Sequence, residues 1–139
     1  MRANIYKLKK LSTIIIACSL FLLAFITCRQ VHIFESSHKI ISRVNDSSLN
    51  DSVLIFGHVY SAVDNTTPEL YARVWVEKLQ YETSTDTTGF YTLKMPSGTY
   101  TLKCFALYHS EDFTEIIKDI VLLPNEKIEI NFFIGEKIE

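Results

Sequence analysis

The sequence has no excess of positive charge and few residues that break or cross-link a chain. Its 14 Lys and Arg residues are outnumbered by 16 Asp and Glu residues, which gives a formal net charge of -2. Because nucleic-acid binding depends on cationic side chains that neutralise phosphates, this balance excludes nucleic acid as an expected partner. Only four Gly and three Pro residues are present, mostly at expected turns. The segments between them are rich in Val, Ile, Thr, Tyr and Phe, a composition typical of β-strands.

Cysteine is also scarce, with three residues in the chain. Cys18 and Cys28 lie in the N-terminal apolar segment, which leaves Cys104 alone in the region that we expect to fold. No internal disulfide can therefore form there. Cys104 falls on the apolar side of an alternating segment, so we expect it to be a small buried hydrophobic residue rather than a nucleophile or a ligand.

Motifs of catalytic and metal sites are missing as well. No Ser lies in a Gly-x-Ser-x-Gly elbow, and no His-Asp partner can be assigned, so the sequence predicts no enzyme. Asp64 and Asp86 precede turns and are expected to cap backbone amides. No cofactor and no metal site is expected, because none of the histidines has a second ligand at a suitable spacing on its strand; they are His32, His38, His58 and His109.

The N-terminal segment is predicted to direct export. Arg2 and three lysines between residues 7 and 10 precede an apolar run over 11–27. A charged region followed by an apolar region is the order found in export signals. The run is also close to the length of about 20 residues that a membrane-spanning helix needs, so an uncleaved anchor helix is the alternative.

The end of this run resembles a bacterial lipobox, in the segment Ala24-Phe25-Ile26-Thr27-Cys28. The resemblance implies that the Cys28 thiol carries a lipid and that Cys28 becomes the mature N-terminus. The alternative is a cysteine that happens to end a transmembrane helix. Both interpretations give a membrane-anchored protein that faces the periplasm or the cell surface. Residues 1–28 are then signal peptide or anchor, and 29–52, which lack periodicity near their end, are a tether.

From residue 53 onward, apolar and polar residues alternate as they do in half-buried strands. The stretch 86–102 predicts a β-hairpin, with a Pro96-Ser97-Gly98 turn between its two arms. About seven such segments, with turn signals every eight to twelve residues, indicate a β-sandwich.

The order of these motifs resembles that of the carboxypeptidase regulatory-like domain. The resemblance is carried by Ile55-x-Gly57-x-Val59, Pro68-x-Leu70-x-Ala72-x-Val74-x-Val76, Asp86-x-x-Gly89-x-Tyr91-x-Leu93 and Pro96-x-Gly98-x-Tyr100-x-Leu102. It implies an all-β, seven-strand transthyretin-like (prealbumin-like) Greek-key β-sandwich over 53–135, followed by a tail at 136–139. Hydroxyisourate hydrolases share that fold, but their closing Tyr-Arg-Gly-Ser motif is absent, so a hydrolase is only a distant alternative.

Five aromatic residues are predicted to lie on the outer side of the strands, opposite the small inner residues. Large apolar groups on a surface can form an interaction patch, and Trp75 would be its anchor. An alternative is that the tether covers this face, or that one strand has the opposite register. We therefore predict a non-enzymatic, membrane-tethered accessory module of the bacterial cell envelope that binds protein or carbohydrate, with a structural spacer as the alternative. The five residues are Phe56, Tyr60, Trp75, Phe90 and Phe105.

Overall fold

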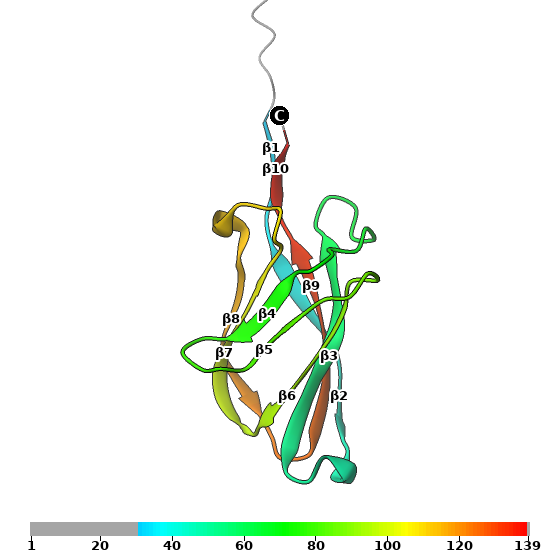
Figure 1. The fold of residues 1–139 in the computed structure, drawn as a ribbon, viewed down its shortest axis with the longest axis vertical. Helices are drawn as coiled ribbons and strands as arrows, with labels where there is room; N and C mark the ends of the chain where they lie inside the picture. Colours follow the sequence, from blue (N-terminus) through cyan, green and yellow to red (C-terminus); the bar gives the residue numbers. More distant parts are fainter. Residues whose placement is uncertain (1–30, 139) are drawn as a thin grey trace, which may run out of the picture. The chain divides into compact units, whose positions relative to one another are not determined.

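The computed structural model describes residues 31–138, and in that part of the chain ten strands and two short 3-10 helices form an all-β domain of sandwich-like sheets (Figure 1). None of the described residues belongs to a helix that is long and apolar enough to cross a membrane. The elements are β1 (His32–Phe34), β2 (Ser37–Asn45), η1 (Ser47–Leu49), β3 (Ser52–Ser61), β4 (Arg73–Val76), β5 (Glu82–Ser84), β6 (Phe90–Pro96), β7 (Gly98–Phe105), η2 (Glu111–Phe113), β8 (Glu115–Leu122), β9 (Glu126–Ile134) and β10 (Glu136–Ile138).

The strands form two four-stranded sheets and one two-stranded ribbon. The first sheet has the order β2-β9-β3-β6, the second has the order β5-β4-β7-β8, and β1 pairs with β10. All pairings are antiparallel except that of β3 with β9, which is parallel. The two larger sheets share one hydrophobic core, to which strands from both contribute.

Alternation along each inner strand builds this core, as the sequence predicts. In β3, for example, Val53, Ile55 and Val59 are completely buried, while Leu54, Phe56 and His58 on the other side of the strand are partly exposed. Burying one such side chain stabilises the fold by about 1.5–3 kcal/mol. The Tyr91 hydroxyl is also buried, and it donates a 2.8 Å hydrogen bond to the carbonyl oxygen of Ile130. That bond satisfies a polar group which would otherwise be costly to bury.

The inward position of Cys104 is confirmed, because its exposed fraction is 0%. Burial raises the pKa of the Cys104 thiol well above its usual value, which keeps the thiol protonated. Asp64 and Asp86 cap their loops as expected. Asp64 accepts hydrogen bonds from the backbone N–H groups of Thr66 and Thr67, at 2.9 and 2.8 Å, and Asp86 accepts one from Thr88 at 2.8 Å.

The predicted hairpin over 86–102 is wrong in its pairing. The strands β6 and β7 lie close to the expected positions, but β6 pairs with β3 while β7 pairs with β4 and β8. Ser97, between the two strands, therefore carries the chain from one sheet to the other. Alternation shows which side of a strand is buried, and it does not show which strand is its neighbour. Two strands that face one core from opposite sheets give the same pattern as two arms of a hairpin.

The expected tether over 29–52 also differs from the structure. Residues 37–45 form β2, which pairs with β9, and residues 32–34 form β1, which pairs with residues of the expected tail. β2 is an edge strand of its sheet, and nearly all of its side chains are exposed. A strand that buries neither face has no need of alternating apolar residues, so residues 37–45 carry no periodic signal.

Side chains of β2 also reach the edge of β8 in the other sheet. The Arg43 guanidinium donates to the Val121 carbonyl oxygen at 3.1 Å, and His38 lies 2.7 Å from the Glu115 carboxylate. These contacts give polar groups at the edge of β8 partners from the opposite sheet, so β2 helps to close that side of the sandwich.

Candidate functional site

The five outer aromatic residues do not form one surface. Trp75 and Phe105 lie on β4 and β7 of the second sheet, whereas the other three lie on β3 and β6 of the first sheet. The outer sides of two packed sheets point in opposite directions, so the expected patch divides into two. All five side chains are half-buried, and the ring of Trp75 is therefore available on the surface.

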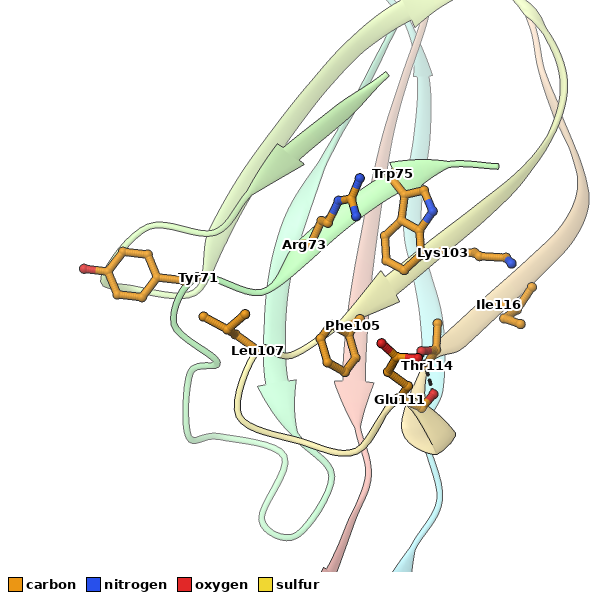
Figure 2. A pocket seen from close by; sticks show the side chains of 9 residues that line it. All are labelled: Tyr71, Arg73, Trp75, Lys103, Phe105, Leu107, Glu111, Thr114 and Ile116. Carbon is orange, nitrogen blue, oxygen red and sulfur yellow. Dashed lines mark hydrogen bonds between the residues drawn. The ribbon is translucent and has the colours of Figure 1, made fainter. Parts of the chain in front are cut away.

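Trp75 and Phe105 line a surface hollow of about 540 Å³ on the outer side of the second sheet (Figure 2). The rest of its apolar lining comes from Tyr71 before β4, Leu107 after β7 and Ile116 in β8. Tyr71 and Leu107 are 55% and 59% exposed, so part of the apolar lining lies open to solvent. We refer to this site as the hollow.

The polar lining carries both signs of charge. Arg73 and Lys103 each form an ion pair with a carboxylate, Arg73 with Glu82 and Lys103 with Glu77 at 2.8 Å. The hydrogen bond from Lys103, followed by its charge, lowers the pKa of Glu77 below the ordinary value. The Glu111 side chain takes part in none of the ion pairs found among residues 31–138. Its backbone carbonyl accepts a 2.8 Å hydrogen bond from the Thr114 hydroxyl, which Figure 2 shows as a dashed line.

Strand pairing explains how these side chains meet. Val74 and Val76 point into the core, so Arg73 and Trp75 point outward from β4. In the antiparallel register, Arg73 is opposite Phe105 and Trp75 is opposite Lys103. Each of the two cross-strand pairs therefore contains one aromatic ring and one cation, and the order is reversed from one pair to the next.

Tyr71 lines the hollow but is not among the site residues that the sequence predicts. Its backbone has φ +55°, in the left-handed region that large side chains rarely adopt. Such a conformation costs about 1–3 kcal/mol and often occurs at functional sites. The alternation around residue 71 looked like a continuous strand, although β4 begins only at Arg73. No signal in the sequence distinguishes this turn.

On the first sheet, the outer aromatic side chains form a row of rings. His58 lies between Phe90 and Tyr60, with ring centroids 5.3 and 5.6 Å away, and Phe133 continues the row at 6.0 Å from Tyr60. The Lys127 ammonium lies 5.0 Å from the centroid of the Phe56 ring. The rings of the row pack against one another, and they are half-buried, as Trp75 and Phe105 are.

The side chains of two other histidines, His38 and His109, have protein partners. His38 pairs with Glu115, and His109 Nε2 lies 3.1 Å from the Glu69 carboxylate while its Nδ1 lies 3.1 Å from the Gly135 carbonyl oxygen. Within residues 31–138, no group of three or more His, Cys, Asp or Glu residues is placed to hold a metal ion.

The Lys103 ammonium and the Asn131 amide, the two groups that an isopeptide bond would join, have separate partners. Lys103 pairs with Glu77, and the Asn131 side-chain oxygen accepts a 2.9 Å hydrogen bond from the His58 backbone. They lie on different sheets. The structure therefore does not bring them together.

The predicted lipid site at Cys28, and the segment 1–28 as a whole, lie outside the described residues. The chain matches no protein-family model, and it matches no curated protein. The geometry of the hollow is therefore the basis for a functional proposal.

Proposed function

We propose that the protein is a non-enzymatic binding module that holds its ligand in the hollow. The observation that carries this proposal is the pair Trp75 and Phe105, two large half-exposed rings at diagonally neighbouring positions of β4 and β7 within a concave surface. Exposed apolar surface of this kind marks sites of interaction, and aromatic residues dominate binding energies at such sites.

The polar groups of the hollow support binding rather than catalysis. Arg73 and Lys103 already have carboxylate partners, and Thr114 donates its hydroxyl proton to a backbone carbonyl. None of these groups forms the hydrogen-bonded pair of nucleophile and base that covalent catalysis requires. They are suited to orienting a ligand by hydrogen bonds.

The strained backbone at Tyr71 is a second support. The left-handed conformation turns a large ring outward at the rim, where its side chain is 55% exposed. Such a position gives the fold little burial energy in return for the strain. Contact with a ligand is a reason for a large residue to occupy it.

The cellular setting belongs to the same proposal. The charged and apolar order of residues 2–27 supports export, and the lipobox-like sequence supports a lipid on Cys28, with an anchor helix as the alternative. The two packed sheets support a relationship with the transthyretin-like carboxypeptidase regulatory-like domains. The protein would then be a membrane-tethered accessory module of the bacterial envelope.

An affinity experiment tests the binding role. Immobilised full-length protein is exposed to bacterial envelope extract, and the retained protein and total carbohydrate are measured for the wild type, for Trp75→Ala and for Phe56→Ala. Phe56 is a matched control, because it is also a half-buried outer aromatic residue with a cation 5.0 Å from its ring. We expect the wild type and Phe56→Ala to retain bound material and Trp75→Ala to retain none. Equal retention by all three proteins would contradict the proposal and favour a structural spacer.

A further inference from the structure

The size of the hollow indicates a small ligand. Nine residues line a volume of about 540 Å³. Sites for small molecules typically have volumes of about 300–1,000 Å³. A stable protein interface usually takes about 20–30 residues from each partner, which is two to three times the lining of this site.

The charges of the hollow do not favour an anionic ligand. The two cations of the lining are neutralised by the carboxylates of Glu77 and Glu82, and the lining contains one further carboxylate, that of Glu111. An anion would meet no net positive charge. The hollow nevertheless keeps hydrogen-bonding capacity, because a guanidinium and an ammonium group have more N–H donors than these contacts use, and a carboxylate has several acceptor sites.

An extended peptide is poorly suited to this surface. β4 lies between β5 and β7, and β7 lies between β4 and β8, so their backbone groups pair within the sheet. A peptide that lay over β4 and β7 would therefore have no strand edge to which it could add, although strand addition is a common way to bind extended chains.

We propose that the ligand of the hollow is an uncharged oligosaccharide, an inference that depends on the proposed binding function. A pyranose ring presents C–H groups on its faces and hydroxyl groups around its edge. The rings of Trp75 and Phe105 supply apolar surface for such a face. Arg73, whose guanidinium lies 5.0 Å from the centroid of the Trp75 ring, and Lys103 supply donors for the hydroxyl groups. Glu111 and the lone pairs of Thr114 supply acceptors. Binding is then driven by apolar contact and neutral hydrogen bonds, so it depends little on salt.

Trp75 is the single tryptophan of the chain, so its fluorescence reports on the hollow directly. The full-length protein is titrated with a panel of neutral tetrasaccharides made from glucose, galactose, mannose or N-acetylglucosamine. Polygalacturonate serves as the charged comparison. We expect at least one neutral tetrasaccharide to cause a saturable shift of the emission. The dissociation constant should change less than twofold between 50 and 500 mM NaCl.

Variants connect that signal to the site. Phe105→Ala and the exposed Tyr71→Ala should each weaken binding about tenfold, a loss of ~1.4 kcal/mol. Phe56→Ala on the opposite sheet should change it less than twofold. Tyr71 is a second probe because its truncation removes little buried surface, and thermal melting confirms that each variant is folded.

The two experiments together distinguish a failure of the oligosaccharide inference from a failure of the proposed binding function. If no neutral tetrasaccharide shifts the emission but Trp75-dependent retention of envelope protein persists, the oligosaccharide inference is overturned and the binding function stands. If polygalacturonate alone binds and salt weakens it strongly, the inference is also overturned. If no oligosaccharide shifts the emission and Trp75→Ala retains as much envelope material as the wild type, both proposals are overturned.

Discussion

The Arg73 guanidinium lies 5.0 Å from the centroid of the Trp75 ring, while its N–H groups form an ion pair with Glu82. Arg73 thus contacts the Trp75 ring, and Glu82 on the neighbouring strand β5 fixes the position of Arg73. Surface cation–π contacts contribute about 0.5–1 kcal/mol. Exposed ion pairs contribute about 0–1 kcal/mol. The arrangement therefore orients Trp75 more than it stabilises the fold.

Substituting Arg73→Ala should lower the free energy of unfolding by only about 1 kcal/mol. It should also shift the emission of Trp75 to longer wavelength, because the ring gains contact with water. Urea unfolding and fluorescence spectra measure the two effects. Lys94→Ala, an exposed cation on β6, is the control and should change neither. A loss above about 3 kcal/mol would show that Arg73 has a role in the core that this geometry does not give it.

Substituting Tyr71→Gly should stabilise the protein relative to Tyr71→Ala. Both variants remove the ring, but only glycine adopts a φ near +55° without steric cost. Left-handed conformation costs other residues about 1–2 kcal/mol, and the greater freedom of glycine in the unfolded chain offsets about half of the gain. We expect a difference of about 0.5–1 kcal/mol in urea unfolding. Equal stability of the two variants would mean that residue 71 is not strained.

Glu69 should make the protein less stable as pH rises through the acidic range. Burial raises the pKa of its carboxyl above the ordinary 4.5, although the charge of His109 acts in the opposite direction. The folded protein then binds the proton more tightly than the unfolded chain does. This contribution is fully present below pH 4.5 and is lost as pH rises through the higher folded value.

Unfolding free energies measured between pH 3.5 and 7 for the wild type and Glu69→Gln test this sign. Gln has nearly the same shape and does not titrate, so the wild type should lose stability relative to the variant as pH increases. Charged and titratable groups around Glu69, including His109, Asp64 and Glu136, remain in both proteins. A relative gain by the wild type over the same interval would show that the ion pair with His109 outweighs burial.

Substituting Gly57→Ala should be severely destabilising. A Cβ atom at this position would lie 2.0 Å from the carbonyl oxygen of Ile130, which belongs to the backbone of the parallel neighbour β9. Backbone cannot move aside as a flexible side chain can, so we expect a loss of about 4 kcal/mol or more. Circular dichroism melting measures this loss. His58→Ala, at the next residue, should cost far less, and a similar cost for both would contradict the close approach.

Metabolic labelling with palmitate tests the lipid on Cys28. We expect the wild type to incorporate the label and Cys28→Ser to lose it, because the thiol is the proposed acceptor. Cys18→Ser is the matched control within the same segment and should keep the label. Label that survives Cys28→Ser would reject Cys28, and an unlabelled wild type would favour an anchor helix.

The sequence predicted those parts of the fold in which burial differs between the two sides of a strand. Val53, Ile55 and Val59 alternate because they face the core, and Cys104 follows the same rule. The edge strand β2 was missed because neither of its faces is buried. Alternation of apolar and polar residues therefore identifies strands with one buried side, and it cannot identify a strand with no buried side.

The candidate site was predicted less completely. Trp75 and Phe105 were placed correctly on outer sides and do lie together in the hollow. Phe56 was grouped with them because alternation cannot distinguish the outer sides of two different sheets. Tyr71 was missed because a left-handed backbone angle at a tyrosine leaves no trace in the residue pattern.

The passage from β6 to β7 has a consequence for how the molecule comes apart. Pro96 ends a strand of one sheet, Gly98 begins a strand of the other, and Ser97 alone separates them. Because this connection is only one residue long, one sheet cannot separate from the other while the other stays folded. Melting of the domain should therefore be all-or-none, with calorimetric and van't Hoff enthalpies that agree.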